Sequence, residues 1–389
     1  MTSVVFYIQH LLGMGHVHRT AALAEAVAQA GKRLDVEVVV INGGTNDMTT
    51  MVPNCRVEQL PPIGIHERDF NDHRDADGNP VTDEYRHART RRLIALVKTI
   101  KPAALVLELY PFGRRGFKFE LEPLLTEIAD WDDRPITISS VRDVLVPPSK
   151  EKRLPWIADQ LSQHIDHILV HGDPKFMRLE DSFPVDPSYA NRLTYTGFVV
   201  DQRSARPVIS AFQEPGEEVV VSAGGGAVGY DLLACAMSAK SHTILADRRW
   251  HLICGPSMPG EDIARLMNHA PEGVVIEKAR PDMAVLHSTA ALSIGQAGYN
   301  TVMEWLLAGR RGLAVPYDEG QETEQRVRAD RLMQHGLVHV EPAEGLTPER
   351  LAAAVNRLWE EGTVLDPRPE ISLDGAGKTA AFILEHIDR

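Results

Sequence analysis

His16 is the residue of this sequence whose position most strongly suggests a catalytic role. It ends the turn GMGH, residues 13–16, which follows an apolar run over Val4–Gln9 and precedes a helical pattern over His18–Ala30. A histidine at a helix N-terminus faces the positive end of the helix dipole, which lowers its pKa and favours the neutral base. We therefore interpret His16 as a general base that takes a proton from an attacking hydroxyl. The alternative is a residue that caps or packs the helix. Gly15 in the same turn lets a substrate approach the backbone closely.

Polar side chains follow two further strand patterns. Asp143 comes shortly after one apolar run, and Glu324 and Gln325 follow the run Gly312–Pro316. Open α/β sheets bind ligands at the carboxyl ends of their strands. We expect Asp143 to orient the catalytic base or bind a sugar hydroxyl, and Glu324 and Gln325 to bind a hydroxyl-rich ligand. A solvated loop is the alternative for the last two.

Two glycine turns in the second half of the chain are typical of phosphate sites. The first follows the apolar run Glu218–Ser222 and consists of Gly224, Gly225 and Gly226. The second contains Gly298, before a helix that we expect to begin near Asn300 or Thr301. Free N–H groups and the helix dipole both attract phosphate there, which indicates a diphosphate or nucleotide ligand. The spacing of a dinucleotide-binding motif is not met, which disfavours a nicotinamide or flavin enzyme.

Glu304 allows two interpretations. It follows Thr301 by three positions, which is the spacing of a helix capping box. Its carboxylate is also suited to accept hydrogen bonds from both ribose hydroxyls of a nucleotide. The spacing alone favours the cap.

A basic, aromatic segment, YPFGRRGFKF at residues 110–119, is the candidate acceptor side. Arg114 and Arg115 are placed to contact an anionic lipid headgroup or an acceptor phosphate. A surface loop with snorkelling side chains is the alternative.

Composition excludes several classes of protein. The net charge of −13 disfavours a general nucleic-acid binder. Three cysteines, without metal or disulfide spacing, indicate a reducing cytoplasm. We expect no metal site, no signal peptide and no membrane span, because no apolar run approaches about 18 residues.

The order of strand and helix patterns predicts two α/β domains. A βαβ unit opens the chain, and the alternation restarts after the Pro-containing segment Asp201–Gly216. We predict an N-terminal domain over residues 1–200 and a C-terminal domain over 201–389, with the last helix able to pack back on the first domain.

The segment SIGQAGYNTVMEWLLAGRRGLAVPYDEGQETEQRVRAD, residues 293–330, resembles the C-terminal signature of family 28 glycosyltransferases, the family of the peptidoglycan N-acetylglucosaminyltransferase. The matching positions are Ser293, Gly298, Thr301, Glu304, Ala308, Gly309, Pro316, Gln325 and Ala329. The turn at residues 13–16, the pair Thr196-Gly197 and the turn at residues 223–226 resemble further family motifs. The likeness therefore touches both halves of the chain.

The resemblance implies the GT-B fold, with two facing Rossmann-like domains and a central cleft. It implies an inverting, metal-independent transfer of a hexose-type sugar from a UDP-sugar, with UDP-GlcNAc as a candidate donor and no cofactor. The first domain would bind the acceptor and the second the nucleotide sugar, with Glu304 on the ribose, Glu324 and Gln325 on the sugar, and the glycine turns on the diphosphate. Arg280 and Met283, in the segment ARPDM, would frame the base. A cytoplasmic enzyme at the inner face of the membrane would suit such a role.

Three departures from the family pattern bear on function. The first turn has fewer glycines, an arginine expected after Thr196-Gly197 is replaced by Val200 and Asp201, and Arg328 stands where asparagine is usual. The acceptor loops match nothing specific, so a peptidoglycan acceptor is not implied. The turn GMGHVHR also resembles the nucleotide-sugar hydrolase of pseudaminic acid synthesis, and UDP-GlcNAc 2-epimerases share the fold. A non-catalytic subunit that binds nucleotide sugar is the remaining alternative.

Overall fold

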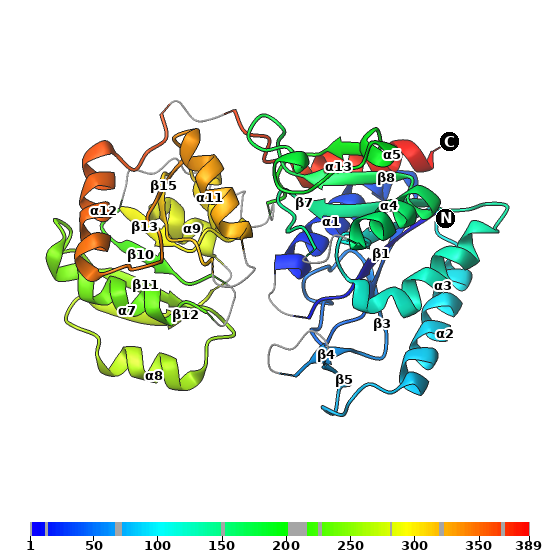
Figure 1. The fold of residues 1–389 in the computed structure, drawn as a ribbon, viewed down its shortest axis with the longest axis horizontal. Coiled ribbons are helices and arrows are strands. Elements are labelled where there is room, and N and C mark those ends of the chain that lie inside the picture. Colours follow the sequence, from blue (N-terminus) through cyan, green and yellow to red (C-terminus); the bar gives the residue numbers. More distant parts are fainter. Residues whose placement is uncertain are drawn as a thin grey trace. The chain divides into compact units, whose positions relative to one another are not determined.

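The computed structural model describes residues 2–11, 15–66, 72–148, 152–200, 216–224, 228–280, 282–318, 323–366 and 370–388. The chain divides into two compact units (Figure 1). The first contains Met1–Val199 and Asp374–Arg389, and the second contains Val200–Leu373. Each unit is built on one parallel sheet, so the predicted α/β class with two Rossmann-like parts is confirmed.

The sheet of the first unit has seven strands in the order β3-β2-β1-β6-β7-β8-β9. Its strands are β1 (Thr2–Ile8), β2 (Val36–Asn42), β3 (Arg56–Gln59), β6 (Ala104–Glu108), β7 (Ile136–Arg142), β8 (His167–His171) and β9 (Leu193–Tyr195). Nearly every residue of the central strands is apolar and buried, as expected for a parallel sheet covered on both faces.

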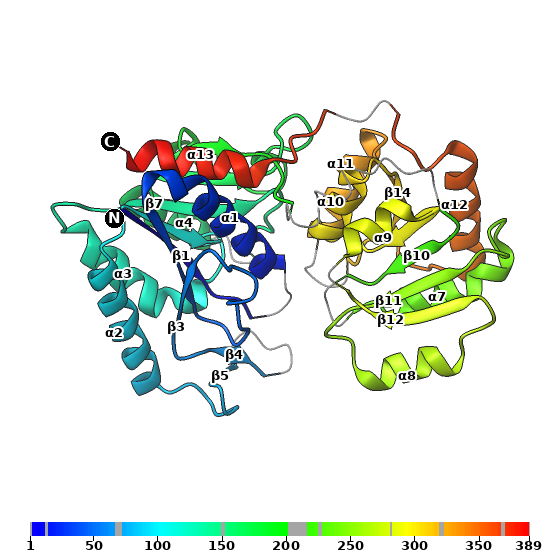
Figure 2. The ribbon, with the colours of Figure 1, turned by 180° about the vertical axis from the view of Figure 1, so that it is seen from behind.

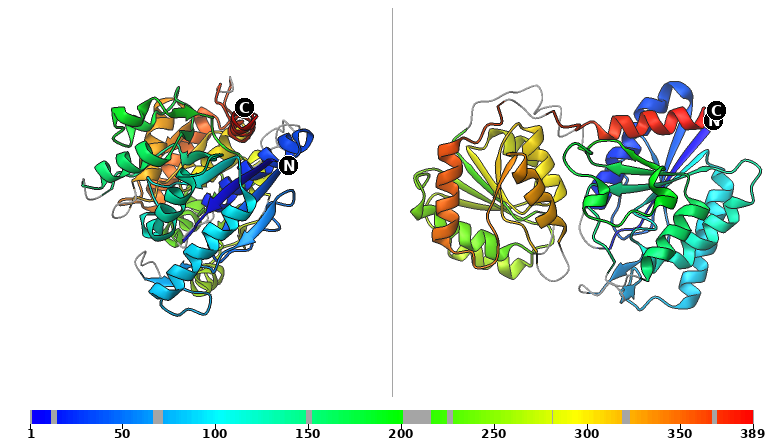
Figure 3. Two further views of the ribbon diagram at one scale, coloured as in Figure 1. Left: turned by 90° about the vertical axis from the view of Figure 1, so that its right-hand side faces the viewer. Right: turned by 45° about the horizontal axis from the view of Figure 1, so that its top comes forward.

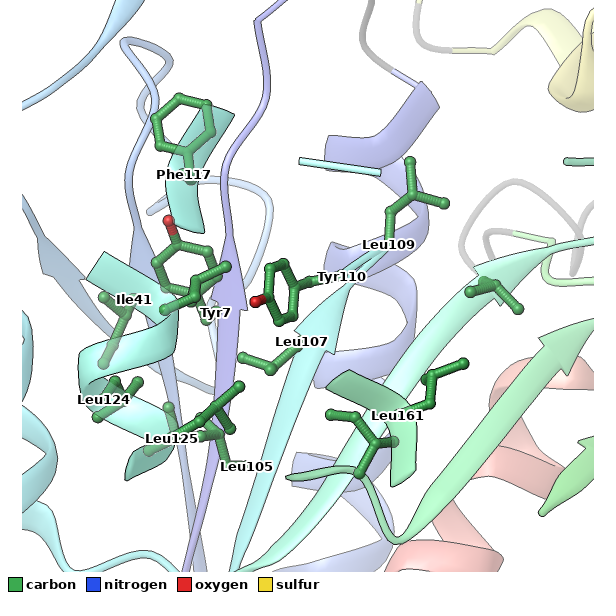
Figure 4. Close-up of a cluster of buried hydrophobic side chains, with 14 of the residues drawn as sticks. Tyr7, Ile41, Leu105, Leu107, Leu109, Tyr110, Phe117, Leu124, Leu125 and Leu161 are labelled. Carbon is green, nitrogen blue, oxygen red and sulfur yellow. The ribbon is translucent and has the colours of Figure 1, made fainter. Parts of the chain in front are cut away.

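Helices cover both faces of this sheet because strand side chains alternate between faces. Val5 and Tyr7 of β1 belong to one core cluster, whereas Val4, Phe6 and Ile8 belong to the other. The first cluster is closed by α2 (Asp83–Ile100), α3 (Lys118–Ala129) and α4 (Arg153–His164). Figure 4 shows this cluster, with Tyr7, Leu105 and Leu107 of the sheet beside Leu124 and Leu125 of α3.

The last helix of the chain, α13 (Gly375–Ile387), belongs to the first unit. It packs against α1 (Gly15–Gly31), and the two helices lie side by side in Figures 1 and 2. Ala376, Ala380 and Ile383 are buried in the same cluster as the inner side of α1. The C-terminal helix therefore completes the core on that face of the sheet.

The sheet of the second unit has six strands in the order β12-β11-β10-β13-β14-β15. Its strands are β10 (Val219–Ser222), β11 (Trp250–Cys254), β12 (Val274–Lys278), β13 (Leu292–Gly295), β14 (Gly312–Ala314) and β15 (Val338–Val340). All the registered pairs are parallel.

Helices also cover both faces of the second sheet, as Figure 3 shows. One core cluster includes α7 (Tyr230–Ala239), α8 (Gly260–Asn268) and α12 (Pro348–Glu361). On the other side, α9 (Met283–Thr289) packs against α10 (Tyr299–Leu307), and α11 (Glu324–Gln334) packs against β15. In α12, the face with Leu351, Ala354, Val355 and Leu358 is buried as its 3.6-residue spacing predicts.

Two segments without a periodic pattern contain regular structure. Residues 64–82 are mostly polar and include the antiparallel pair β4 (Gly64–Ile65) and β5 (His73–Arg74). The segment 110–119 contains a 3-10 turn (Arg115–Phe117) and the start of α3. Both elements are too short or too rich in charged residues to give a periodic signal. In the part of the chain that is described, no helix is long and apolar enough to cross a membrane.

Candidate functional site

In the first unit, polar and charged side chains gather where neighbouring parallel strands end. Glu108 is the last residue of β6, Asp143 directly follows β7, and His171 ends β8. Each is buried, with an exposed fraction of 3%, 1% and 0% respectively. Buried polar groups at this edge are costly unless they are paired or used, so the edge is a candidate site.

His16, in the first turn of α1, contacts a carboxylate. Its Nδ1 lies 2.7 Å from Glu108 Oε1, and Arg19, one turn further along the helix, donates a hydrogen bond to the same oxygen. Arg19 Nη2 also lies 3.1 Å from His16 Nδ1. Nδ1 thus meets both an acceptor and a donor, but the carboxylate is nearer and Arg19 already donates to Glu108. Because an ionised carboxylate only accepts hydrogen bonds, this geometry favours the proton of a neutral His16 on Nδ1 and the lone pair on Nε2.

The electrostatics of this pair suit a general base. Burial lowers the pKa of His16 to about 4, against the attraction of Glu108, so the imidazole is neutral at pH 7. Burial alone would raise the pKa of Glu108, but His16, Arg19 and Arg114 outweigh burial and hold that pKa well below its usual range. The arrangement therefore holds one ring tautomer with an ionised partner, as in histidine–carboxylate catalytic pairs.

Arg114 adds positive charge to this site. Its Nε and Nη2 atoms are buried without a hydrogen-bond partner among the described residues, and burial lowers the pKa of its guanidinium despite the nearby Glu108. Its backbone has φ = 59°, and Leu109 at the start of the same loop has φ = 64°. Left-handed backbone at non-glycine residues is strained and concentrates at functional sites.

Arg115 points elsewhere. It is exposed, and its guanidinium lies 5.9 Å from the ring centroid of Trp156 in α4. The two neighbouring arginines, predicted together as an acceptor side, therefore have different surroundings.

In the second unit, the turn before α10 has the uncapped helix N-terminus that is typical of phosphate sites. Gly298 is the N-cap residue of α10, with φ = −61°, and no side chain caps this helix. A Cβ atom added at Gly298 would meet nothing within 4 Å, so the first N–H groups of α10 are approachable. The other turn is described only at Gly224, which follows β10 with φ = 68°; Gly225 and Gly226 lie outside the described residues.

The capping-box interpretation of Glu304 is wrong. Thr301 is the third residue of α10 and is buried, and Gly298 occupies the cap. The helix begins three residues earlier than a cap at Thr301 requires, because glycine is also a favoured N-cap residue. Glu304 is thus left without a capping role.

Glu304 instead faces a buried histidine. Its Oε2 lies 3.6 Å from His287 Nε2 of α9, and the side chain of Glu304 is 22% exposed. Burial raises the pKa of Glu304 to about 8 and lowers the pKa of His287 to about 3, so both are mainly neutral at pH 7 in the unliganded protein. The contact is therefore not an ion pair in this state.

Glu324 and Gln325 begin α11 and are engaged within the protein. Glu324 Oε1 accepts a hydrogen bond from Arg328 Nη2 at 2.7 Å, and Gln325 Oε1 accepts one from the Tyr317 N–H at 3.0 Å. Arg328 also donates to the carbonyl of Ala297 at 3.0 Å. The arginine that replaces the family's usual asparagine thus links α11 to the turn before α10.

Of the two residues expected near the nucleotide base, Arg280 lies between β12 and α9 and Met283 lies in α9. Arg280 donates to Asp282 at 2.6 and 2.7 Å and to Glu277 at 3.3 Å, which together raise the pKa of its guanidinium. Met283 is the first residue of α9. A side chain held by two carboxylates leaves the neighbouring backbone, rather than the guanidinium, as the group able to meet a base.

Three of these residues were missed by sequence reasoning. Glu108 ends the apolar strand β6, so the end-of-strand rule that pointed to Asp143 could also have found it. Arg19 follows His16 by three positions and shares its helix face. His287 lies in a short helix with no motif, and no local signal marks it. No group of three potential metal-ligating side chains is found within the described ranges.

Comparison with known proteins gives a consistent family. Residues 220–383 match the model of the glycosyltransferase family 28 C-terminal domain. A UDP-N-acetylglucosamine–N-acetylmuramyl-(pentapeptide) pyrophosphoryl-undecaprenol N-acetylglucosamine transferase of Mesorhizobium japonicum is 30% identical over 186 residues. This match covers 46% of the chain and 49% of that relative, so the chain spans about half the length of the curated protein it resembles.

Solved structures show the same fold. Acinetobacter baumannii MurG superposes with a TM-score of 0.61 at 16% identity, covering 99% of this chain and all of that one. The glycosyltransferase of kitacinnamycin gives 0.62 at 16% identity, covering 99% and 98%. Residues 220–383 therefore match the C-terminal domain of family 28 glycosyltransferases, and the chain has the two-domain fold of GT-B glycosyltransferases.

Proposed function

We propose that this protein is an inverting, metal-independent glycosyltransferase that moves a hexose-type sugar from a UDP-sugar to an acceptor hydroxyl. The name of the curated relative makes UDP-GlcNAc the first donor to test. The observation that carries the proposal is the 2.7 Å contact between His16 Nδ1 and Glu108 Oε1, which leaves the other ring nitrogen free to take a proton.

The chemistry needs two sites with separate tasks. The acceptor oxygen attacks the anomeric carbon as its proton passes to His16 Nε2, and the bond from that carbon to the diphosphate oxygen breaks. The sugar ends on the acceptor with inverted configuration, and UDP leaves with the electron pair of the broken bond. Attack from the face opposite the leaving group produces the inversion.

The second unit supplies the donor site in this proposal. The open N-terminus of α10 at Gly298, Thr301 in its first turn, and the turn at Gly224 bind and stabilise the departing diphosphate. Glu304 binds the ribose hydroxyls. Gln325 and Glu324 contact the sugar, and the backbone beside Arg280 and Met283 holds the base.

The first unit supplies the acceptor site. Gly15 leaves open space beside His16, since a Cβ added there would meet nothing within 4 Å. Asp143 binds an acceptor hydroxyl or supports His16. Arg114 attracts an anionic group of the acceptor, while Arg115 contributes to a basic surface at the inner face of the membrane.

Release of UDP tests the proposal. The protein is incubated with each UDP-sugar, with and without an extract that contains acceptors. Release that requires the extract supports transfer, and rapid release without it indicates a nucleotide-sugar hydrolase with the same base. Saturable binding without release indicates a binding subunit.

His16→Ala should lower the rate of UDP release by about 10²–10⁴-fold. His18→Ala is the matched control, because His18 is an exposed histidine on the same helix. Full turnover in the His16 variant would show that the base is assigned to the wrong residue.

A further inference from the structure

His287 is a buried histidine to which the proposed chemistry gives no task. It is fully buried in α9, and its two ring nitrogens have different neighbours. Nδ1 lies 3.0 Å from Ser293 Oγ and 3.3 Å from Trp305 Nε1, and Nε2 lies 3.6 Å from Glu304 Oε2. The histidine thus bridges the indole of α10 and the carboxylate one residue before it.

Trp305 determines which nitrogen of His287 carries the proton. An indole N–H can only donate, so the Nδ1 that it meets must accept. The hydroxyl of Ser293 then donates to the same nitrogen. Since a neutral imidazole has one N–H, that proton belongs on Nε2 and points at Glu304.

The Nε2–H of His287 points at an acceptor that it does not reach. Nε2 is buried and has no hydrogen-bond partner among the described residues, and a distance of 3.6 Å to Glu304 is too long for a hydrogen bond. A buried unmade hydrogen bond is costly, so a rotation of Glu304 that closes this gap is favourable. Hydrogen bonds of this kind often tighten only when the ligand binds.

We propose that His287, held in one tautomer by Trp305, positions the Glu304 carboxylate to receive the ribose hydroxyls of the nucleotide. This inference rests on the proposed function. His287 is a positioning residue, because it acts through Glu304 and does not touch the nucleotide. One carboxylate oxygen takes the His287 hydrogen bond, and the remaining lone pairs accept from the ribose.

In the described part of the chain, His287 is the titratable group that lies within 4 Å of the Glu304 carboxylate. Glu324 and Arg328 of α11 pair with each other at 2.7 Å, and Arg310, after α10, donates to the carbonyl of Ser288 at 3.1 Å. A carboxylate that burial disfavours needs a donor to be ionised, and the His287 Nε2–H supplies one.

Binding of UDP and of 2′,3′-dideoxy-UDP to the full chain tests the inference. His287→Phe keeps a ring but removes the donor, and it should weaken UDP by about tenfold while changing the dideoxy nucleotide by less than about twofold. His287→Gln keeps an N–H at similar reach and should stay within about threefold of the parent for both. In a Glu304→Gln background, His287→Phe should have no further effect.

The pH dependence of UDP affinity distinguishes a positioning role of His287 from a packing role, because a packing role would not change it. UDP affinity should rise with pH as Glu304 ionises, and His287→Phe should shift this rise to higher pH. His339→Phe is the matched control, because His339 is a partly buried histidine of the same unit whose Nε2 lies 2.9 Å from another carboxylate, Glu361, outside the proposed site. It should leave both affinities and the pH profile unchanged.

Three results distinguish failure of the proposed function from failure of this inference. If the parent protein does not bind UDP, the proposed donor is wrong and the inference fails with it. If UDP binds through Glu304 but His287→Phe leaves its affinity unchanged, or weakens both nucleotides equally, only the inference is overturned. Should His287→Phe not fold, Trp305→Phe replaces it. Loss of UDP affinity with unchanged dideoxy-UDP affinity then supports the inference. If UDP affinity is not lost selectively, the inference is overturned.

Discussion

His16 can act as a base only while its Nδ1 keeps the ring proton. Glu108 provides this condition, because its ionised carboxylate accepts from Nδ1 and is itself held by Arg19. The same end-of-strand reasoning that pointed to Asp143 applies to Glu108, so the sequence predicted the kind of residue and its place but named a different one. The role of Asp143 stays a prediction.

At the same scale, we predict that Glu108→Gln lowers the turnover of UDP-sugar by about 10²–10⁴-fold, since the amide can hold either tautomer of His16. UDP affinity should not change, because Glu108 belongs to the other unit. Steady-state rates and calorimetric binding measure the two effects. Glu25→Gln is the control: Glu25 is a buried carboxylate on the same helix as His16 and accepts from Asn54. Unchanged turnover in a folded Glu108 variant contradicts the assignment.

Glu304 gives a prediction about pH. Burial raises its pKa to about 8, so in the empty site it is mostly protonated at pH 7 and ionises as the pH rises. Ribose hydroxyls need the ionised form as acceptor, so UDP affinity should increase between about pH 7 and pH 9. The increase should be absent in Glu304→Gln, which also corrects for titration of UDP itself. An equal slope in both proteins would show that Glu304 does not bind the ribose.

In the proposed function, helix α10 is the element that carries the donor site. Its glycine cap leaves the first N–H groups without a side-chain partner, and its side chains Glu304 and Trp305 face His287. At the other end, Gly312 of β14 lies so close to the Trp305 ring that an added Cβ would come within 2.2 Å of it. Glycine there lets the strand approach the indole, which in turn fixes the histidine.

Gly298→Ala tests whether phosphate approaches the start of α10. The added methyl meets no protein atom within 4 Å and φ is −61°, so stability should change little. If the diphosphate lies against this backbone, UDP should bind about tenfold or more weakly, while thermal unfolding of the free protein stays the same. Gly260→Ala is the control, since Gly260 opens α8 with equally free space. Unchanged UDP affinity in Gly298→Ala would exclude this cradle.

At the scale of the whole molecule, the chain forms two compact units and passes between them twice. The second crossing returns α13 to the first unit, where it completes a core that α1 leaves open. The last residues of the chain therefore stabilise the unit that contains the first.

We predict that Ile383→Ala destabilises the first unit alone, by about 2–5 kcal/mol, because the side chain is fully buried against α1 and the sheet. Denaturant unfolding followed with probes in each unit should show one transition shifted and the other unchanged. Glu385→Ala, on the exposed side of the same helix, should shift neither. A shift of both transitions would mean that the units unfold together.

The sequence by itself determined the strands, the main helices and the glycine turns. The predicted apolar run Glu218–Ser222 contains β10, and the run Gly312–Pro316 begins with β14, since buried parallel strands need continuous apolar residues. The family motif lies within β13, α10, β14 and α11, the elements that it predicts. These are local properties, fixed by residues close together in the chain.

Tertiary structure alone decided which side chains meet. Glu108 lies 92 residues from His16, and their contact depends on the order of β1 and β6 in the sheet. Thr301 and Glu304 have the spacing of a cap, but the N-cap of α10 is Gly298, which removes that role. His287 and Glu304 become neighbours because α9 packs on α10, and burial then sets their protonation. Contacts between distant elements, and the desolvation that follows from them, have no signal in local sequence.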